Sequence, residues 1–173
     1  MANKAGGALS VYLQTNIPVL LREFPRSGIL NMVVDLAEEQ GWPLEVVIAA
    51  MHDPIDFGGL PVPSDDGTVH YVPQDWARRL ADHKGPSILF LDEIDKASPI
   101  MQSALLPVVQ ERMVGDLYLG DEVRIIATTN HSEEGSKKLS ASLADSFVRV
   151  DWRPSVTEMA EAILETDKPE LGC

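Results

Sequence analysis

The most regular feature of the sequence is a series of short apolar runs, separated by segments with helical spacing. The runs cover residues 17–21, 44–50, 87–91, 123–129 and 147–152. Strands that are apolar on both faces are typical of parallel sheets with helices packed on each side. The pattern therefore predicts an α/β fold of three layers, with a parallel five-stranded sheet at its centre.

The segments between these runs repeat apolar residues three and four positions apart, as amphipathic helices do. The first such stripe runs from Ile29 to Ala37, and Gly41 is a typical helix stop. A longer helix is expected to begin at Ser98-Pro99, where a capping residue precedes a proline. Shorter helices are expected within residues 73–84, 139–143 and 156–164.

Two segments predict turns rather than long regular elements. Residues 53–75 are rich in Pro, Gly and Asp, which predicts a long surface loop. Residues 115–121 carry glycines on both sides of a short apolar stretch, which predicts a small hairpin.

The charge of the chain narrows the classes of function. Its 173 residues include 27 acidic and 14 basic side chains, a net charge of −13. Nucleic-acid modules and binders of anionic membranes need a basic surface, so both classes are excluded.

No apolar run approaches the roughly 20 residues of a membrane-spanning helix. Cys173 is the one cysteine, which excludes a disulfide or a cysteine-based zinc site within a chain. We expect a cytoplasmic protein of one domain.

Two carboxylates directly follow the apolar run at 87–91. Parallel sheets bind ligands beyond the carboxyl ends of their strands, so Asp92 and Glu93 are candidate site residues. Adjacent strand residues point to opposite faces, so the two suit separate tasks. One would hold Mg²⁺ and its waters, and the other would polarise an attacking water. The competing interpretation is a strand that is acidic at its end without function. Asp95 and Lys96 are interpreted as charges that flank the next helix.

Asp92-Glu93 and the segment 125–130 together resemble motifs of the AAA+ ATPases, specifically of the MoxR-like branch. The first is similar to the Walker B motif of that family, and the second to its sensor 1 strand, which ends in Asn130. The resemblance implies a P-loop NTPase core with ATP and Mg²⁺ as cofactors. It also implies Glu93 and Asn130 as catalytic residues and Asp92 as the metal ligand.

The elements around these motifs follow the same order as in that branch. A helix after Walker B, the hairpin at 115–121 and the loop at 53–61 each resemble an element of the MoxR-like proteins. The resemblance covers residues 10–155, which is nearly the whole chain. Several motifs in the right order make it more specific than any one of them alone.

The phosphate-binding loop departs from the family pattern. Such a loop reads G-x-x-x-x-G-K-[ST], and the corresponding residues here are 23–30. Glu23 replaces the first glycine, Ile29 replaces the lysine that meets the phosphates, and Leu30 replaces the hydroxyl that ligates Mg²⁺. Aliphatic side chains can do neither task, and the helical stripe predicts that Ile29 packs into the core. The candidate cofactor-binding segment is this degenerate loop: Pro25, Arg26, Ser27, Gly28, Ile29 and Leu30.

Two further departures concern arginines. The family usually has an arginine finger before the phenylalanine of the last strand, where this chain has Ser146. A helical lid with a second arginine usually follows the sheet, whereas only residues 153–173 follow Trp152. We therefore expect an AAA+ core at residues 1–155. Residues 156–173 are expected to form a C-terminal helix and tail, with the lid absent or reduced.

These features favour a degenerate MoxR-like AAA+ protein, impaired in ATP binding and hydrolysis, that acts as a binding or assembly subunit or remodels a partner. Its partner would be another protein or an AAA+ oligomer, with no nucleic acid and no membrane. The alternative is an active Mg-dependent ATPase in which Arg22 or Arg26 replaces the missing lysine. A third hypothesis is a divalent-metal site formed by Asp92, Glu93 and Asp95 without nucleotide.

Overall fold

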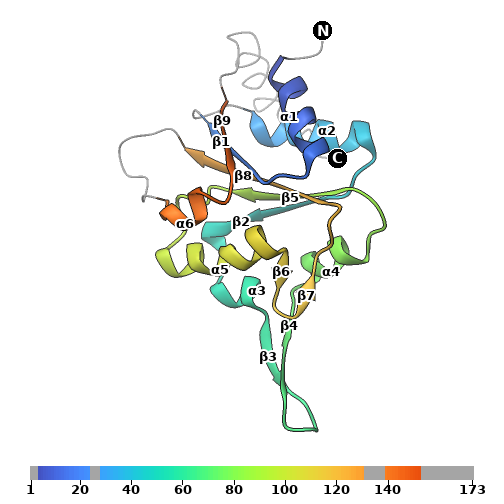
Figure 1. Ribbon diagram of the computed structural model, residues 1–173, viewed down its shortest axis with the longest axis vertical. Coiled ribbons are helices and arrows are strands. Elements are labelled where there is room, and N and C mark those ends of the chain that lie inside the picture. The colour runs from blue at the N-terminus through green and yellow to red at the C-terminus, as the bar shows by residue number, and fades with distance from the viewer. Residues whose placement is uncertain (1–3, 24–27, 131–138, 153–173) are drawn as a thin grey trace, which may run out of the picture.

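A five-stranded parallel sheet runs through the centre of the computed structural model, which describes residues 4–23, 28–130 and 139–152 (Figure 1). Every pairing between neighbouring strands of this sheet is parallel. The predicted α/β fold with five parallel strands is confirmed. In spatial order the strands are β2 (Leu44–Ile48), β5 (Ser87–Asp92), β8 (Val123–Asn130), β1 (Val19–Glu23) and β9 (Val148–Asp151).

Helices cover both faces of the sheet, so the described chain has three layers (Figure 1). On one face lie α1 (Lys4–Thr15) and α2 (Ile29–Gln40). The other face is covered by α3 (Pro54–Gly58), α4 (Asp75–Asp82), α5 (Pro99–Glu111) and α6 (Ala141–Ala144). Among the helices that the structure describes, none has the length and apolar character needed to cross a bilayer.

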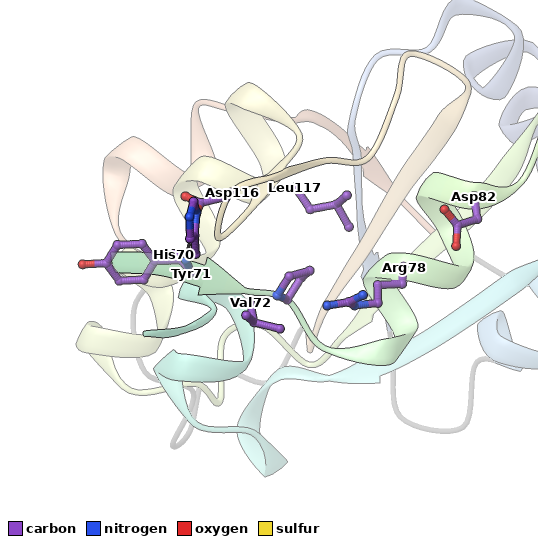
Figure 2. Close-up of a pocket in the computed structure, with 8 residues that line it drawn as sticks. His70, Tyr71, Val72, Arg78, Asp82, Asp116 and Leu117 are labelled. Atoms are coloured by element: carbon purple, nitrogen blue, oxygen red, sulfur yellow. Dashed lines mark hydrogen bonds and ion pairs between the residues drawn. The ribbon is translucent and has the colours of Figure 1, made fainter. Parts of the chain in front are cut away.

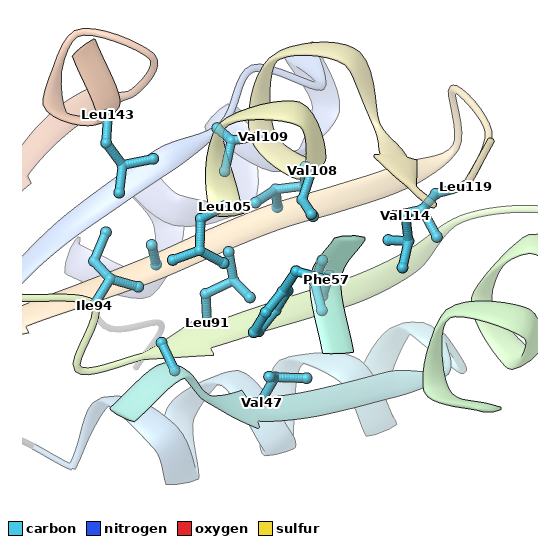
Figure 3. Packing of buried hydrophobic residues seen from close by; sticks show 14 of the residues in the cluster. Val47, Phe57, Leu91, Ile94, Leu105, Val108, Val109, Val114, Leu119 and Leu143 are labelled. Carbon is cyan, nitrogen blue, oxygen red and sulfur yellow. The ribbon is translucent and has the colours of Figure 1, made fainter. Parts of the chain in front are cut away.

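Alternate residues of β5 pack into two hydrophobic clusters, one on each face of the sheet. Ile88 and Phe90 pack with the cluster that includes α1 and α2. Leu89 and Leu91 pack with the cluster that includes α3, α4 and α5, where Phe57 and Leu105 are fully buried (Figure 3). Successive strand residues point to opposite faces, so a continuous apolar run buries this central strand on both sides.

The predicted helix signals are found at the ends of α2 and α5. Gly41 ends α2 in a left-handed conformation with φ 66°, where glycine carries no steric penalty. Ser98 caps α5 through its side chain, which accepts a hydrogen bond from the Met101 amide at 3.3 Å. Both predicted boundaries are therefore confirmed.

Residues 53–75 are more regular than the predicted surface loop. A short 3₁₀ helix (Ala49–Met51) and α3 precede a hairpin of β3 (Leu60–Pro63) and β4 (Val69–Val72), which projects from the body of the molecule (Figure 1). The prolines of β3 disguise the strand, but Pro61 and Pro63 lie opposite Tyr71 and Val69 on an edge strand, where proline is tolerated.

The sequence pattern does not reveal the helix α1, which forms at residues 4–15. Two glycines in this segment lower its helix propensity, and the packing of Leu9 and Leu13 against the sheet compensates. A smaller hairpin, β6 (Met113–Val114) and β7 (Leu117–Tyr118), begins two residues before the predicted one. The predicted helix at 156–164 and the tail lie outside the described residues.

Candidate functional site

The acidic turn after β5 is held against the end of β8 by Thr128. Regular pairing between these strands ends at Leu91 and Ala127. Beyond it the chain turns at Glu93, whose φ of 51° is uncommon for a residue with a side chain. The turn aims two successive amides at Thr128: the Glu93 N–H donates to Thr128 Oγ1 at 2.9 Å, and the Ile94 N–H donates to Thr128 O at 3.1 Å.

The same threonine also orients the first carboxylate. Thr128 Oγ1 donates a hydrogen bond to Asp92 Oδ1 at 2.5 Å. The threonine is fully buried and Asp92 is half-buried. The hydroxyl therefore fixes the Asp92 carboxylate at the carboxyl edge of the sheet, where α/β proteins bind ligands.

Glu93 and Asn130 meet at this edge. Asn130 Nδ2 donates to Glu93 Oε1 at 3.5 Å, and the ammonium of Lys96 forms an ion pair with the same oxygen. The hydrogen bond to Glu93 raises the pKa of Lys96 above its ordinary value. The structure thus brings together Asp92, Glu93 and Asn130, as the sequence predicts, and adds a cation of the chain itself.

Asp95 differs from its interpretation as a charge flanking a helix. The side chain is 4% exposed, and its Oδ1 accepts a hydrogen bond from the Asn130 amide at 3.4 Å. Burial is the main cause that raises its pKa above the ordinary value. The sequence pattern misses this because the turn folds Asp95 under the end of β8, which spacing along the chain does not show.

The three carboxylates do not form a metal cage. Within residues 4–23, 28–130 and 139–152 the structure places no three His, Cys, Asp or Glu side chains so that they could share a metal ion. Asp95 is bound to a backbone amide and Glu93 to Lys96. The hypothesis of a divalent-metal site formed by Asp92, Glu93 and Asp95 alone is therefore wrong.

Within the segment expected to be a degenerate phosphate loop, the described part is Gly28 and the start of α2. Gly28 precedes the helix with φ 69°, Ile29 is 1% exposed within the core, and Leu30 is 39% exposed. The predicted packing of Ile29 is confirmed. The strand that leads to the loop pairs with β8, and Glu23 lies opposite Asn130 in that register. Pro25, Arg26 and Ser27 lie outside the described residues.

Ser146, where the resemblance implies an arginine finger in the family, is hydrogen-bonded within its own chain. Its hydroxyl donates to Ser142 O at 2.8 Å and accepts a hydrogen bond from Gln110 Nε2 at 2.8 Å. These contacts connect Ser146, two residues after the end of α6, to α5 and α6, so the side chain stabilises the packing of these helices.

A separate cavity of about 310 Å³ lies at the root of the β3–β4 hairpin (Figure 2). It shares no lining residue with the acidic turn. Beside it, Tyr71 and Asp116 exchange two hydrogen bonds, from the Tyr71 amide to Asp116 Oδ2 at 2.7 Å and from the Asp116 amide to Tyr71 O at 3.1 Å. The cavity is lined by His70, Tyr71, Val72, Pro73, Arg78, Asp82, Asp116 and Leu117.

Comparison with known families gives a match over most of the sheet. Residues 45–147 match the family described as AAA domain (dynein-related subfamily). This range includes the acidic turn and Asn130, and it begins after residues 23–30. No curated protein matches the sequence.

Solved structures with the same fold are distant in sequence. An inferred ATPase from Cytophaga hutchinsonii is 20% identical, with a TM-score of 0.60 over 95% of this chain and 50% of its own. NtrX from Brucella abortus in complex with ATP is 18% identical, with a TM-score of 0.58, over 95% and 38%. An MCM homolog from Methanopyrus kandleri is 19% identical, with a TM-score of 0.59, over 95% and 38%. The chain therefore spans half or less of the length of these structures.

Proposed function

Because the chain belongs to the AAA domain family, dynein-related subfamily, we propose that it is a member whose nucleotide site is impaired and that it acts by binding or assembling with a protein partner. Within the wider group of AAA+ proteins, the MoxR-like branch is the finer assignment. The β6–β7 hairpin between α5 and β8 supports that assignment, since it lies where the resemblance expects it.

The observation that carries this proposal is the burial of Ile29. A phosphate loop needs a cation directly after its second glycine, to meet the β and γ phosphates. The residue after Gly28 is instead an aliphatic side chain that is 1% exposed and packed among α1, α2 and the sheet. Leu30, at the position of the hydroxyl that would ligate Mg²⁺, carries no oxygen in its side chain. The described start of α2 therefore fits a core, not a triphosphate.

The acidic half of the site fits a nucleotide better than the phosphate half does. Mg²⁺ in such sites is held by one or two carboxylates together with phosphate oxygens and waters. Asp92, fixed by Thr128, would be the residue to hold it. The phosphate side has no matching lysine or hydroxyl at Ile29 and Leu30, so the described residues do not support a hydrolytic step.

A second candidate function, an active Mg-dependent ATPase, is favoured by one specific observation. Asp92, Glu93 and Asn130 lie together at the carboxyl edge of the sheet with their hydrogen bonds in place. In that case Asp92 would hold the metal, Glu93 would activate a water that Asn130 orients, and Arg22 or Arg26 would replace the lysine. The described Arg22 is exposed and its guanidinium lies 3.7 Å from Asp151 Oδ1, so an acidic side chain already competes for it.

The proposed binding role is supported by the surface of the β3–β4 hairpin. Leu60, Val69 and Tyr71 are 53%, 51% and 46% exposed on an element that projects from the fold (Figure 1). Exposed apolar side chains gathered on one element are typical of protein interaction sites. The two prolines of β3 lack the N–H that strand addition requires, so contact through side chains is expected.

Phosphate release in the presence of ATP and Mg²⁺ separates the two candidate functions. The impaired site predicts that the unmodified protein releases phosphate no faster than its Glu93→Gln variant, because neither turns over ATP. Release that is faster in the unmodified protein, and is lost in Glu93→Gln and Arg26→Ala, would establish the active alternative.

The molar mass in solution tests the assembly role. We expect a mass above that of the 18.9 kDa monomer, or a partner protein that co-purifies. A double change Leu60→Ser with Val69→Ser is expected to reduce this association. Ile100→Ser is the matched control, since Ile100 is 71% exposed and lies outside the hairpin. A strict monomer that retains no partner would contradict the binding role.

A further inference from the structure

Asp95 is the one charged side chain that the fold buries, among those whose burial the structure describes. Its Oδ1 is bound to the Asn130 amide, but its buried Oδ2 has no hydrogen-bond partner among the residues that the structure describes. A buried carboxyl oxygen without a partner costs folding free energy. An apolar residue of similar shape would avoid that cost. Asp95 is therefore a poor choice for stability alone. Its hydrogen bond to the Asn130 amide is the contact that an apolar residue could not make.

The contact is the last of a series that ties the acidic turn to β8. Thr128 binds the Asp92 carboxylate and the amides of Glu93 and Ile94. Two residues further along β8, the Asn130 amide points to the same side of the strand as the Thr128 carbonyl. It donates a hydrogen bond to Asp95 Oδ1. Without Asp95 the series of backbone contacts would end at Thr128, and among the described contacts only the 3.5 Å hydrogen bond from Asn130 Nδ2 to Glu93 Oε1 would link Asn130 to the turn.

We propose that Asp95 is a positioning residue, which holds the backbone of Asn130 so that the side-chain amide of Asn130 stays within reach of Glu93. The 3.4 Å bond to the Asn130 amide fixes the backbone, and the 3.5 Å approach of Asn130 Nδ2 to Glu93 Oε1 follows from it. Asp95 touches no reacting atom in this arrangement and acts through Asn130. The burial that raises its pKa is consistent with a group retained for placement at an expense in stability.

This inference rests on the proposed assignment of Asn130 to the site, but its test needs no nucleotide. Whether the site binds ATP is decided by other measurements. A failed nucleotide experiment would therefore leave the role of Asp95 open to its own test, and the reverse also holds.

Amide hydrogen exchange followed by NMR tests the proposal directly. Asp95→Leu removes the acceptor and the unpartnered oxygen together. We expect exchange of the Asn130 amide to accelerate about tenfold or more, while the Thr129 amide, which points to the β1 side, is unchanged. The melting temperature is expected to stay equal or rise, because a buried polar group has been removed. The resonances of the Asn130 side-chain amide should shift as its contact with Glu93 loosens.

Asp95→Asn is the matched variant, since it keeps an acceptor oxygen at the same place and removes the charge. It is expected to retain the exchange rate of the Asn130 amide. If Asp95→Leu fails to fold, Asp95→Ala provides the same measurement. An unchanged Asn130 amide in the variants without an acceptor would overturn the proposal. Equal acceleration of all β8 amides would also overturn it, because that result indicates a purely structural role.

Discussion

Thr128 Oγ1 lies 2.5 Å from Asp92 Oδ1 and, as the donor, fixes that carboxylate at the edge of the sheet. The same oxygen accepts the Glu93 amide at 2.9 Å, so one hydroxyl serves both residues of the acidic pair. Thr128 belongs to the candidate site, although the sequence pattern alone does not mark it as a site residue. The sequence feature that could identify it is its position two residues before Asn130. At that position its backbone carbonyl faces the turn after β5.

Thr128→Val keeps the shape of this buried side chain and removes both hydrogen bonds. The Glu93 amide then loses its acceptor in a half-buried place, so we expect the free energy of unfolding to fall by about 1–3 kcal/mol. Denaturation in urea measures the change. Thr129→Val is the matched control, since the neighbouring side chain points to the other face of β8. Equal stability of the two variants would show that the hydroxyl does not hold the turn.

Gly115 marks a place where two hairpins come into contact. A Cβ at Gly115 would lie 2.5 Å from Tyr71 O, and its φ is 59°. Gly67, at the tip of the β3–β4 hairpin, also has a positive φ, 84°, but a Cβ there would meet nothing within 4 Å. Gly115→Ala is therefore expected to lower the free energy of unfolding by about 1–3 kcal/mol more than Gly67→Ala. Thermal unfolding of the two variants checks this, and equal losses would contradict the close approach.

Arg112 donates hydrogen bonds to three oxygens at the end of the sheet opposite the acidic turn. Two are backbone carbonyl oxygens and one is a side-chain amide oxygen. Its guanidinium donates to Val123 O at 2.5 Å and to Asn16 O and Oδ1 at 3.0 Å each. Arg112→Met keeps the aliphatic stem but leaves these half-buried acceptors unpaired, so a loss of about 1–3 kcal/mol in unfolding free energy is expected.

Arg149→Met is the control for this change. Its guanidinium forms an exposed ion pair with Asp145 at 2.9 Å, and such pairs contribute about 0–1 kcal/mol. Urea unfolding compares the two variants. A loss at Arg149 as large as that at Arg112 would contradict the role given to burial.

The burial of Asp95 predicts a pH dependence of stability. Burial raises the pKa of Asp95 in the folded chain, while the unfolded chain keeps the ordinary value near 4. Protonation of Asp95 therefore stabilises the folded chain. This contribution to the free energy of unfolding is fully present below about pH 4 and is lost as the pH rises through the folded pKa. Asp95→Asn does not titrate at this position, and the charges of Glu93 and Lys96 remain in the variant.

The unfolding free energy of Asp95→Asn, relative to the unmodified protein, should therefore increase as the pH rises above about 4 and then level off. Urea titrations at a series of pH values measure this difference. A difference that stays constant with pH would show that Asp95 keeps its ordinary pKa in the folded state.

The sequence predicts the sheet and the central acidic pair because both depend on local patterns. Apolar runs locate the strands, and Gly41 and Ser98 end and begin helices through their own backbone and side-chain chemistry. The burial of Ile29 follows from helical spacing in the same way. These features need no knowledge of which segments meet in space.

What the sequence does not predict depends on contacts between distant segments. The tasks of Thr128 and Asp95 arise only when the turn after β5 folds against the end of β8, 35 or 36 residues away. The β3–β4 hairpin is hidden by its prolines, which are tolerated because their strand is an edge. Propensity alone favours a loop there, and pairing across the hairpin overrides it.

A restored phosphate loop provides the positive control for the proposed impairment of nucleotide binding. Ile29→Lys with Leu30→Ser returns the family residues at both positions. Since Ile29 is 1% exposed, the new lysine enters a packed core, so thermal unfolding must first show that the double variant is folded. A folded double variant is expected to gain affinity for ATP with Mg²⁺.

The proposed impairment of the nucleotide site is tested by a calorimetric titration of ATP with Mg²⁺ into the unmodified protein. The burial of Ile29 and the absence of a side-chain oxygen at Leu30 predict no binding tighter than about 100 μM, which corresponds to about −5.5 kcal/mol. A dissociation constant well below this value would show that the site is not impaired in binding ATP and would favour the active alternative.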